Sequence, residues 1–177
     1  MYVKFIIISD DLSGASGMAS MLGINIPVVP FHKIEIISGL TNKILSVDLE
    51  TRNSEDPVSR LAFMDKNFSE YRILARIDTM IRGSTSQFIQ FMSHYSNLAI
   101  TDTIPEYGRY TSGGFTYYRC ERKDINQAIP ELAKSKVAIL DSADYDDLNR
   151  ISRKCIKENL TPVDPGPLIA TYLRMIT

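Results

Sequence analysis

The chain contains 177 residues, and its 20 Lys and Arg residues nearly balance its 21 Asp and Glu residues. A chain of this length can bury a stable hydrophobic core, so we expect residues 1–177 to form one domain. The balanced charge predicts no nucleic-acid partner, because nucleic-acid-binding proteins usually carry a basic patch.

The cysteines and the N-terminus bear on the cellular compartment. Cys120 and Cys155 lack the CxxC spacing of redox and metal sites, which favours a reducing compartment. Asp10 and Asp11 follow the first apolar run, unlike the start of a secretory signal peptide. No apolar run approaches the length of a membrane span. These features predict a cytoplasmic protein with no membrane partner.

Apolar runs alternate with helical patterns along most of the chain. We predict strands over residues 1–9, 26–29, 43–47, 73–77, 98–100, 137–140 and 161–163. Helical spacing predicts helices over residues 13–22, 57–71, 84–95, 124–134 and 145–158, with a closing helix through 168–173. This alternation predicts an α/β fold, a three-layer (αβα) Rossmann-like domain with a mainly parallel sheet.

Residues 104–120 interrupt the alternation. They contain Pro105, three glycines and five aromatic residues. Gly113 and Gly114 stand between segments of alternating residues, which is typical of a β-hairpin. We therefore predict a hairpin inserted into the α/β domain, where it would act as a lid or a subunit contact.

The first candidate functional stretch is the pair Asp10 and Asp11, directly after the first predicted strand. Ligands of open α/β sheets bind at the carboxyl ends of the strands, which favours a ligand site. The alternative is that Asp11 or Ser13 only caps the following helix, a common role for both residue types. The pattern alone leaves both interpretations open.

Further polar clusters follow later strands. Parallel strands bring their carboxyl ends to one edge, so these clusters can meet in a single pocket. Arginine binds carboxylates in a bidentate manner, and aspartate accepts hydrogen bonds from hydroxyls, so such a pocket suits a small hydroxylated acid. The alternative for each arginine is a solvated charge or an exposed ion pair, and Glu106 with Arg109 could simply rigidify the hairpin. The residues are Thr51 and Arg52; Arg76, Asp78, Arg82 and Gly83; and Glu106 and Arg109.

Several familiar sites are excluded. The sequence has no GxxxxGK[ST] phosphate loop, no GxGxxG dinucleotide fingerprint and no GxSxG nucleophile turn. His32 and His94 have no neighbouring metal-ligand residues in the sequence. We therefore predict no metal site.

Four segments together resemble the four-carbon acid sugar kinase family. Residues 9–15, SDDLSGA, resemble its DDxTGA opening, and residues 48–52, DLETR, resemble its DTx(T/S)R element. Residues 76–83, RIDTMIRG, are similar to KxDSTLRG, and residues 104–109, IPEYGR, are similar to the end of PAFPExGR. The segments occur in the family's order and span most of the chain.

The resemblance implies that the chain corresponds to the N-terminal, sugar-acid-binding domain of an enzyme that phosphorylates threonate or erythronate with ATP. The family's C-terminal nucleotide-binding domain is expected to be absent. Asp11 and Asp10 would then be catalytic, and the substrate-binding set would be Ser13, Arg52, Arg76, Asp78, Arg82, Gly83, Glu106 and Arg109. Arg76 stands where the family has lysine, and Met80 replaces a hydroxyl residue.

Three functions remain open at this point. The first is the substrate half of a phosphotransferase, incomplete alone, which obtains ATP and Mg²⁺ through a separately encoded nucleotide-binding partner. The second is a stand-alone small-acid binding or regulatory protein without catalysis, and the third is another small-acid enzyme that uses the paired aspartates with a metal. A homo-oligomer is compatible with each of them.

Overall fold

A computed structural model describes residues 4–53, 56–79 and 81–177, so residues 1–3 of the first predicted strand and Met80 lie outside the described residues. Seven strands form one sheet in the order β2-β3-β1-β4-β10-β5-β9, and every neighbouring pair is parallel. The strands are β1 (Lys4–Ser9), β2 (Val28–Pro30), β3 (Ile44–Asp48), β4 (Tyr71–Arg76), β5 (Leu98–Ile100), β9 (Val137–Ile139) and β10 (Thr161–Asp164).

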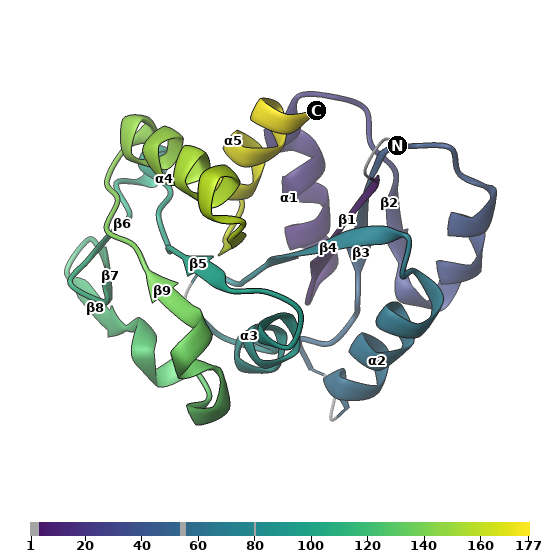
Figure 1. Ribbon diagram of the computed structural model, residues 1–177, viewed down its shortest axis with the longest axis horizontal. Coiled ribbons are helices and arrows are strands. Elements are labelled where there is room, and N and C mark those ends of the chain that lie inside the picture. The colour runs from purple at the N-terminus through teal and green to yellow at the C-terminus, as the bar shows by residue number, and fades with distance from the viewer. Residues whose placement is uncertain (1–3, 54–55, 80) are drawn as a thin grey trace.

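Helices cover both faces of this sheet. Figure 1 shows α1 (Leu12–Leu22), α4 (Tyr145–Glu158) and α5 (Pro167–Ile176) along one side of it. The other side carries α2 (Pro57–Asn67) and α3 (Thr85–Ser93) (Figure 1). The predicted three-layer α/β fold is therefore confirmed. A 3₁₀ segment, η1 (Phe31–Gly39), follows β2 and was not predicted.

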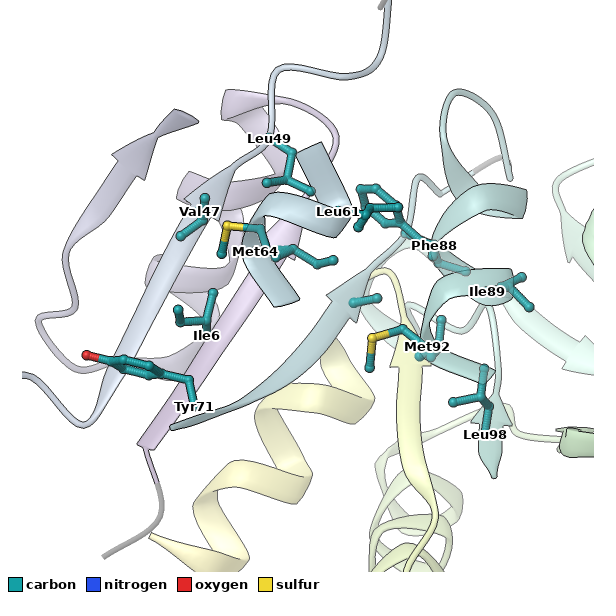
Figure 2. Close-up of a cluster of buried hydrophobic side chains, with 14 of the residues drawn as sticks. Ile6, Val47, Leu49, Leu61, Met64, Tyr71, Phe88, Ile89, Met92 and Leu98 are labelled. Atoms are coloured by element: carbon teal, nitrogen blue, oxygen red, sulfur yellow. The ribbon is translucent and has the colours of Figure 1, made fainter. Parts of the chain in front are cut away.

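The two faces of the sheet belong to separate cores. Ile6 and Ile8 of β1 pack with α2 and α3, and Phe5 and Ile7 pack with α1 and α5. In Figure 2, side chains of α2 and α3, including Leu61, converge on the strands below them. Full burial of one such isoleucine stabilises the fold by about 1.5–3 kcal/mol. Burial on both faces explains why β1 is an almost unbroken apolar run.

Helix α2 is shorter than predicted. Asp56 caps it through a hydrogen bond from Ser59 N at 3.0 Å, and Pro57 occupies the first turn, as the sequence indicates. It ends at Asn67, because Phe68 leaves helical geometry at φ −130°. Tyr71, which we assigned to the helix, instead begins β4.

The predicted hairpin is present. β6 (Tyr110–Ser112) and β7 (Phe115–Tyr118) pair antiparallel around Gly113 and Gly114, whose φ angles are 58° and 84°. Such positive angles favour glycine. A third strand, β8 (Glu121–Asp124), extends the hairpin into a three-stranded sheet. A short 3₁₀ turn, η2 (Pro105–Tyr107), leads into it.

The helix predicted over residues 124–134 is wrong. Asp124 ends β8, and two short 3₁₀ segments come after it, η3 (Ile125–Ala128) and η4 (Glu131–Lys136). Pro130 separates them because it lacks an N–H for a continuous helix. Among the described residues, no helix has the length and apolar character needed to cross a membrane.

Candidate functional site

A row of buried aspartates lines the carboxyl edge of the parallel sheet. Each lies at the end of a strand or within two residues of it, and each is at most 5% exposed. In sheet order β3-β1-β4-β10-β5 they are Asp48, Asp10, Asp78, Asp164 and Asp102. Buried carboxylates need partners, and the partners of these five differ along the row.

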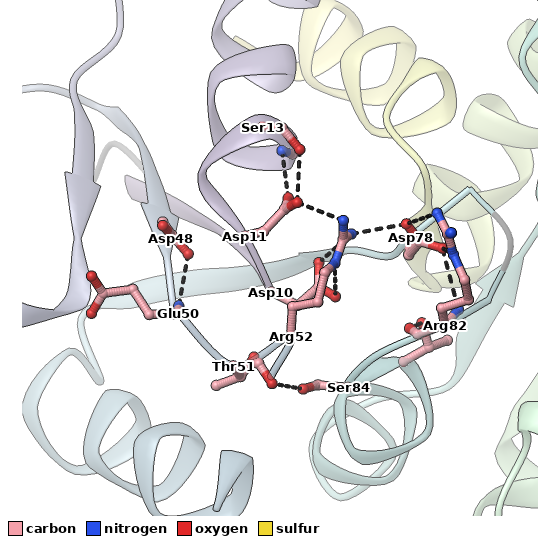
Figure 3. A network of polar contacts seen from close by, with 12 residues as sticks. Asp10, Asp11, Ser13, Asp48, Glu50, Thr51, Arg52, Asp78, Arg82 and Ser84 are labelled. Atoms are coloured by element: carbon pink, nitrogen blue, oxygen red, sulfur yellow. Dashed lines mark hydrogen bonds and ion pairs between the residues drawn. The ribbon is translucent and has the colours of Figure 1, made fainter. Parts of the chain in front are cut away.

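Arg52 is the cation at the centre of the site. Its Nε and Nη2 donate to the two carboxylate oxygens of Asp10, each at 3.1 Å. Nη2 also donates to Asp78 Oδ1 at 2.8 Å, and Nη1 lies 2.6 Å from Asp11 Oδ2. Figure 3 shows the three carboxylates converging on this one guanidinium. Arg52, in the loop after β3, thereby joins the carboxyl ends of β1 and β4.

The backbone holds Arg52 in place. The N–H groups of Thr51 and Arg52 both donate to Asp10 O at 2.9 Å, and Ser84 Oγ donates to Thr51 O at 3.0 Å (Figure 3). The loop after β3 is therefore fastened to the end of β1 and to the start of α3. The predicted convergence of Asp10, Arg52 and Asp78 follows from adjacent parallel strands.

Arg82 lies on the solvent-exposed side of Asp78, next to Arg52. Its Nε and Nη2 donate to Asp78 at 2.8 and 3.2 Å, yet its side chain is 63% exposed. We call Asp10, Asp11, Arg52, Asp78 and Arg82 the Arg52 cluster. A guanidinium that is held on one side and solvated on the other can still bind an anion.

Gly83 is required by the packing of the Arg52 cluster. Its φ is +60°, and a Cβ there would lie 2.4 Å from Asp10 Oδ2. No side chain fits between the backbone and that carboxylate. Gly83 thus permits the close approach, although it contributes no functional group of its own.

Both interpretations of Asp11 hold at once. Its carboxylate accepts hydrogen bonds from Gly14 N and Ser13 Oγ, each at 2.7 Å, and so caps α1. The same carboxylate contacts Arg52. Its side chain is 22% exposed, whereas that of Asp10 is 3% exposed. Asp11 is therefore the more accessible of the two.

Within the Arg52 cluster, burial has the largest effect on Asp10. It raises the pKa of Asp10, which the charges of Asp11 and Asp78 raise further and Arg52 opposes. Burial lowers the pKa of Arg52, but the neighbouring carboxylates outweigh it, and the net shift is upward. Asp10 is thus a carboxylate with increased proton affinity beside a permanently charged arginine.

Arg76 reaches the same edge of the sheet on the α1 side. Its Nε donates to Pro165 O at 3.0 Å, and its charge lowers the pKa of Asp164. A Cβ on Gly14 would lie 2.4 Å from Arg76 Nη1 and 2.1 Å from Ser9 Oγ. Arg76 therefore packs between the first turn of α1 and the loop after β10.

Asp164 stabilises the start of α5. Its two oxygens accept hydrogen bonds from Leu168 N at 2.6 Å and Ile169 N at 3.1 Å. Complete burial nevertheless raises its pKa to about 7, against the lowering effect of these bonds and of Arg76.

Glu106 and Arg109 contact other partners. Arg109 is 4% exposed, and its Nη1 lies 3.4 Å from Asp102 Oδ2. Its guanidinium is also 4.6 Å from the ring centre of Tyr118. Glu106 accepts a hydrogen bond from Tyr145 Oη. These contacts support the alternative role that the sequence allowed, the rigidity of the hairpin base.

Burial raises the pKa of Asp102 to about 8, although Arg109 opposes the shift. We call Asp102, Arg109 and Tyr118 the Asp102 cluster. Four buried hydroxyls adjoin it and link β5, β6 and the loop after β9 through contacts of 2.6–3.0 Å. They belong to Thr101, Thr103, Thr111 and Ser142.

Sequence reasoning did not assign functional roles to Asp48, Asp102 and Asp164. All three lie at the end of a short strand or just after it, as Asp10 does, and this shared position is the signal that could have found them. Across residues 4–53, 56–79 and 81–177, no group of three or more His, Cys, Asp or Glu side chains is arranged to hold a metal ion.

No family model matches the sequence, and no curated protein is significantly similar to it. The fold nevertheless resembles solved structures. A domain of unknown function, DUF1537, from Bordetella bronchiseptica superposes with a TM-score of 0.76 at 16% identity, over 99% of this chain and 56% of that one. That protein is a domain-swapped dimer with bound citrate.

Two further structures agree in fold. A DUF1537 protein from Haemophilus influenzae gives a TM-score of 0.66 at 15% identity, over 97% of this chain and 57% of that one. A Salmonella typhimurium LT2 protein with a provisional tRNA-synthase name gives a TM-score of 0.69 at 13% identity, over 98% of this chain and 55% of that one. The chain thus spans little more than half of each similar structure, and similarity at such identity shows the fold alone.

Proposed function

We propose that the Arg52 cluster binds a four-carbon sugar acid, such as threonate or erythronate, as the substrate half of an ATP-dependent kinase. The observation that carries the proposal is the shared guanidinium of Arg52. It contacts three carboxylates, and Arg82, which pairs with one of them, is 63% exposed. The substrate carboxylate would bind Arg82, and its hydroxyls would donate to Asp11.

The two aspartates would take different roles. Asp11 is exposed enough to orient the attacking hydroxyl or accept its proton, and Asp10 would keep Arg52 oriented from below. Phosphoryl transfer depends mainly on positioning and charge stabilisation, so a binding domain of this kind can contribute half of an active site. ATP with Mg²⁺ would be bound by a separate nucleotide-binding domain or chain.

The comparisons support the chemical class of the ligand. Citrate, bound in the Bordetella structure, is itself a small hydroxylated carboxylate. The domain-swapped dimers of that protein are also consistent with a homo-oligomer here. A second function, small-acid binding without catalysis, is favoured by Arg76, which stands at the motif lysine position and packs against α1 and the loop after β10.

Calorimetric titration with erythronate and threonate tests the binding proposal. We expect saturable binding of at least one acid and none of the uncharged polyol erythritol. Arg82→Ala removes a charge-assisted contact and should weaken binding by about tenfold or more. Arg153→Ala, an exposed arginine on α4, is the matched control. Asp11→Asn keeps an oxygen for the helix cap and should weaken binding of the hydroxyls.

Equal binding to wild-type protein and to both site variants would overturn the site. The kinase proposal has a separate readout, which is ATP turnover after addition of candidate nucleotide-binding domains. Binding without turnover with any candidate would favour the regulatory function. Absence of all binding would overturn both functions.

A further inference from the structure

A cavity lies at the opposite edge of the sheet from the Arg52 cluster. It has a volume of about 490 Å³ and opens where β4 and β10 begin, between the C-terminal ends of α2 and α3. This volume falls in the range of small-molecule sites. It uses none of the residues proposed above.

Two aromatic pairs form its walls. Phe68 and Tyr71 lie at the α2–β4 turn with ring centres 6.2 Å apart and planes at 75°. Phe91 and Tyr95 lie at the end of α3 with ring centres 5.2 Å apart. Tyr71 is seen in Figure 2 at the start of β4, away from the centre of the core. Tyr95 is 59% exposed at the rim, so the walls suit a flat apolar group.

The cavity also contains a cation, Arg72. Its side chain is half-buried, its Nη2 donates to Thr161 Oγ1 at 3.4 Å, and its guanidinium lies 5.7 Å from the ring centre of Tyr172. Within the described part of the chain, no carboxylate lies within ion-pair distance of Arg72. A partly buried arginine without a carboxylate is a ready anchor for an anion.

A hydroxyl adds a second donor. Thr161 Oγ1 accepts from Ser96 Oγ at 2.8 Å as well as from Arg72, so its own proton is left to donate. Asp65, an acid that lines the cavity, is already hydrogen-bonded to the Tyr95 hydroxyl. The cavity therefore combines aromatic walls with two hydrogen-bond donors, Arg72 and the Thr161 hydroxyl, that have no anionic acceptor among the described residues.

We propose that this cavity, the Arg72 cavity, binds a small carboxylate with a planar apolar body. The carboxylate contacts Arg72 and Thr161, and the planar body lies between the two aromatic pairs. The proposal does not depend on the sugar-acid site, because the two sites lie at opposite ends of the same strands.

Indole-3-acetate is a suitable probe, and indole-3-ethanol is its neutral counterpart. We expect calorimetry to show saturable binding of the acid. The alcohol should have an affinity at least about tenfold lower, because it cannot form the charge-assisted bonds. Amide chemical shifts should move at the start of β4 and β10 and not around Arg52. Erythronate should not displace the probe.

Two variants locate the contacts. Arg72→Met keeps most of the side-chain length and should reduce acid binding to the level of the alcohol, while alcohol binding stays unchanged. Tyr95→Ala removes an exposed ring and should weaken both probes. Arg153→Met is the matched control for lost surface charge and should leave both affinities unchanged.

Thermal unfolding of each variant verifies that it is folded, and Tyr95→Ala keeps the test decisive should Arg72→Met unfold. No saturable binding of the acid to wild-type protein would overturn the proposal. Equal affinity for acid and alcohol, unchanged binding to folded Arg72→Met, or shifts confined to the Arg52 cluster would overturn it as well.

Discussion

The Arg52 cluster and the Asp102 cluster use the same chemistry at the same edge of the sheet but differ in their access to water. In the first, one arginine is divided among three carboxylates, and Arg82 beside it is 63% exposed. In the second, Arg109 is 5% exposed at its side chain and lies against Tyr118.

This difference is the reason to propose a binding role for the first cluster and a structural role for the second. The exposed face of Arg82 is available to an anion, whereas the cation of the Asp102 cluster is covered by its own protein. The buried pair joins the three-stranded sheet to the end of β5. Both clusters pair arginine with aspartate at the carboxyl ends of strands. They differ in the burial of the arginine side chains.

The largest expected effect comes from removal of the buried cation. Arg109→Ala leaves Asp102 buried without its cation and removes a contact with the Tyr118 ring. Above about pH 8, where Asp102 is ionised, we expect a loss of about 3 kcal/mol in the free energy of unfolding, measured by urea denaturation. The loss should be smaller at neutral and lower pH, where Asp102 carries a proton and needs no cation.

Arg119→Ala is the control, because Arg119 is exposed and also lies near Tyr118. It should cost less than about 0.5 kcal/mol. Comparable losses in the two variants would remove the distinction between the clusters.

A glycine pair tests how tightly the Arg52 cluster is packed. Gly83 and Gly108 have nearly the same φ, +60° and +64°, but a Cβ meets Asp10 Oδ2 only at Gly83. Gly108→Ala should therefore cost about 1 kcal/mol from backbone strain alone. Gly83→Ala should cost about 2–3 kcal/mol, because displacement of Asp10 adds to the same strain.

Thermal and urea unfolding measure both glycine variants. Erythronate titration adds a functional readout, since only Gly83→Ala displaces a carboxylate of Arg52. Equal destabilisation of the two variants would show that the cluster tolerates an extra methyl group.

The sequence predicted the parts that depend on local patterns. The apolar run before Asp10 marked β1, and the parallel alternation brought Asp10, Arg52 and Asp78 to one edge. Strand order was not predicted, because the partners of a strand depend on packing between distant segments. Asp164 and Asp102 could have been found from their positions at strand ends, but their neighbours in the row depend on that order.

Competing local signals explain the wrong helix at residues 124–134. Residues 124–134 carry a partial helical pattern, but the free edge of β7 pairs with residues up to Asp124, and Pro130 interrupts the remaining segment. Glu106 and Arg109 were predicted near the substrate from motif position. Their contacts with Tyr145 and Asp102 could not be predicted without the path of the hairpin.

A dependence of stability on pH also tests the burial that sets the two clusters apart. Asp102 and Asp164 have pKa values of about 8 and about 7 in the folded protein, above the ordinary value of 3.8. The folded protein therefore keeps protons that the unfolded chain releases between about pH 4 and pH 8. Stability should fall as the pH rises through this window, by at most about 1.4 kcal/mol per pH unit for each carboxyl.

Asp102→Asn assigns this slope to the Asp102 cluster. The amide keeps the shape of the side chain but cannot titrate. The free energy of unfolding should therefore fall less steeply between pH 4 and pH 8, by the contribution of one carboxyl. Asp146→Asn, at an exposed position in the first turn of α4, should leave the slope unchanged. The Arg52 cluster cannot produce the same change, because Asp102→Asn leaves it intact. An unaltered slope in Asp102→Asn would mean that Asp102 is ionised in the folded protein, and the Asp102 cluster would then be a true ion pair like those of Arg52.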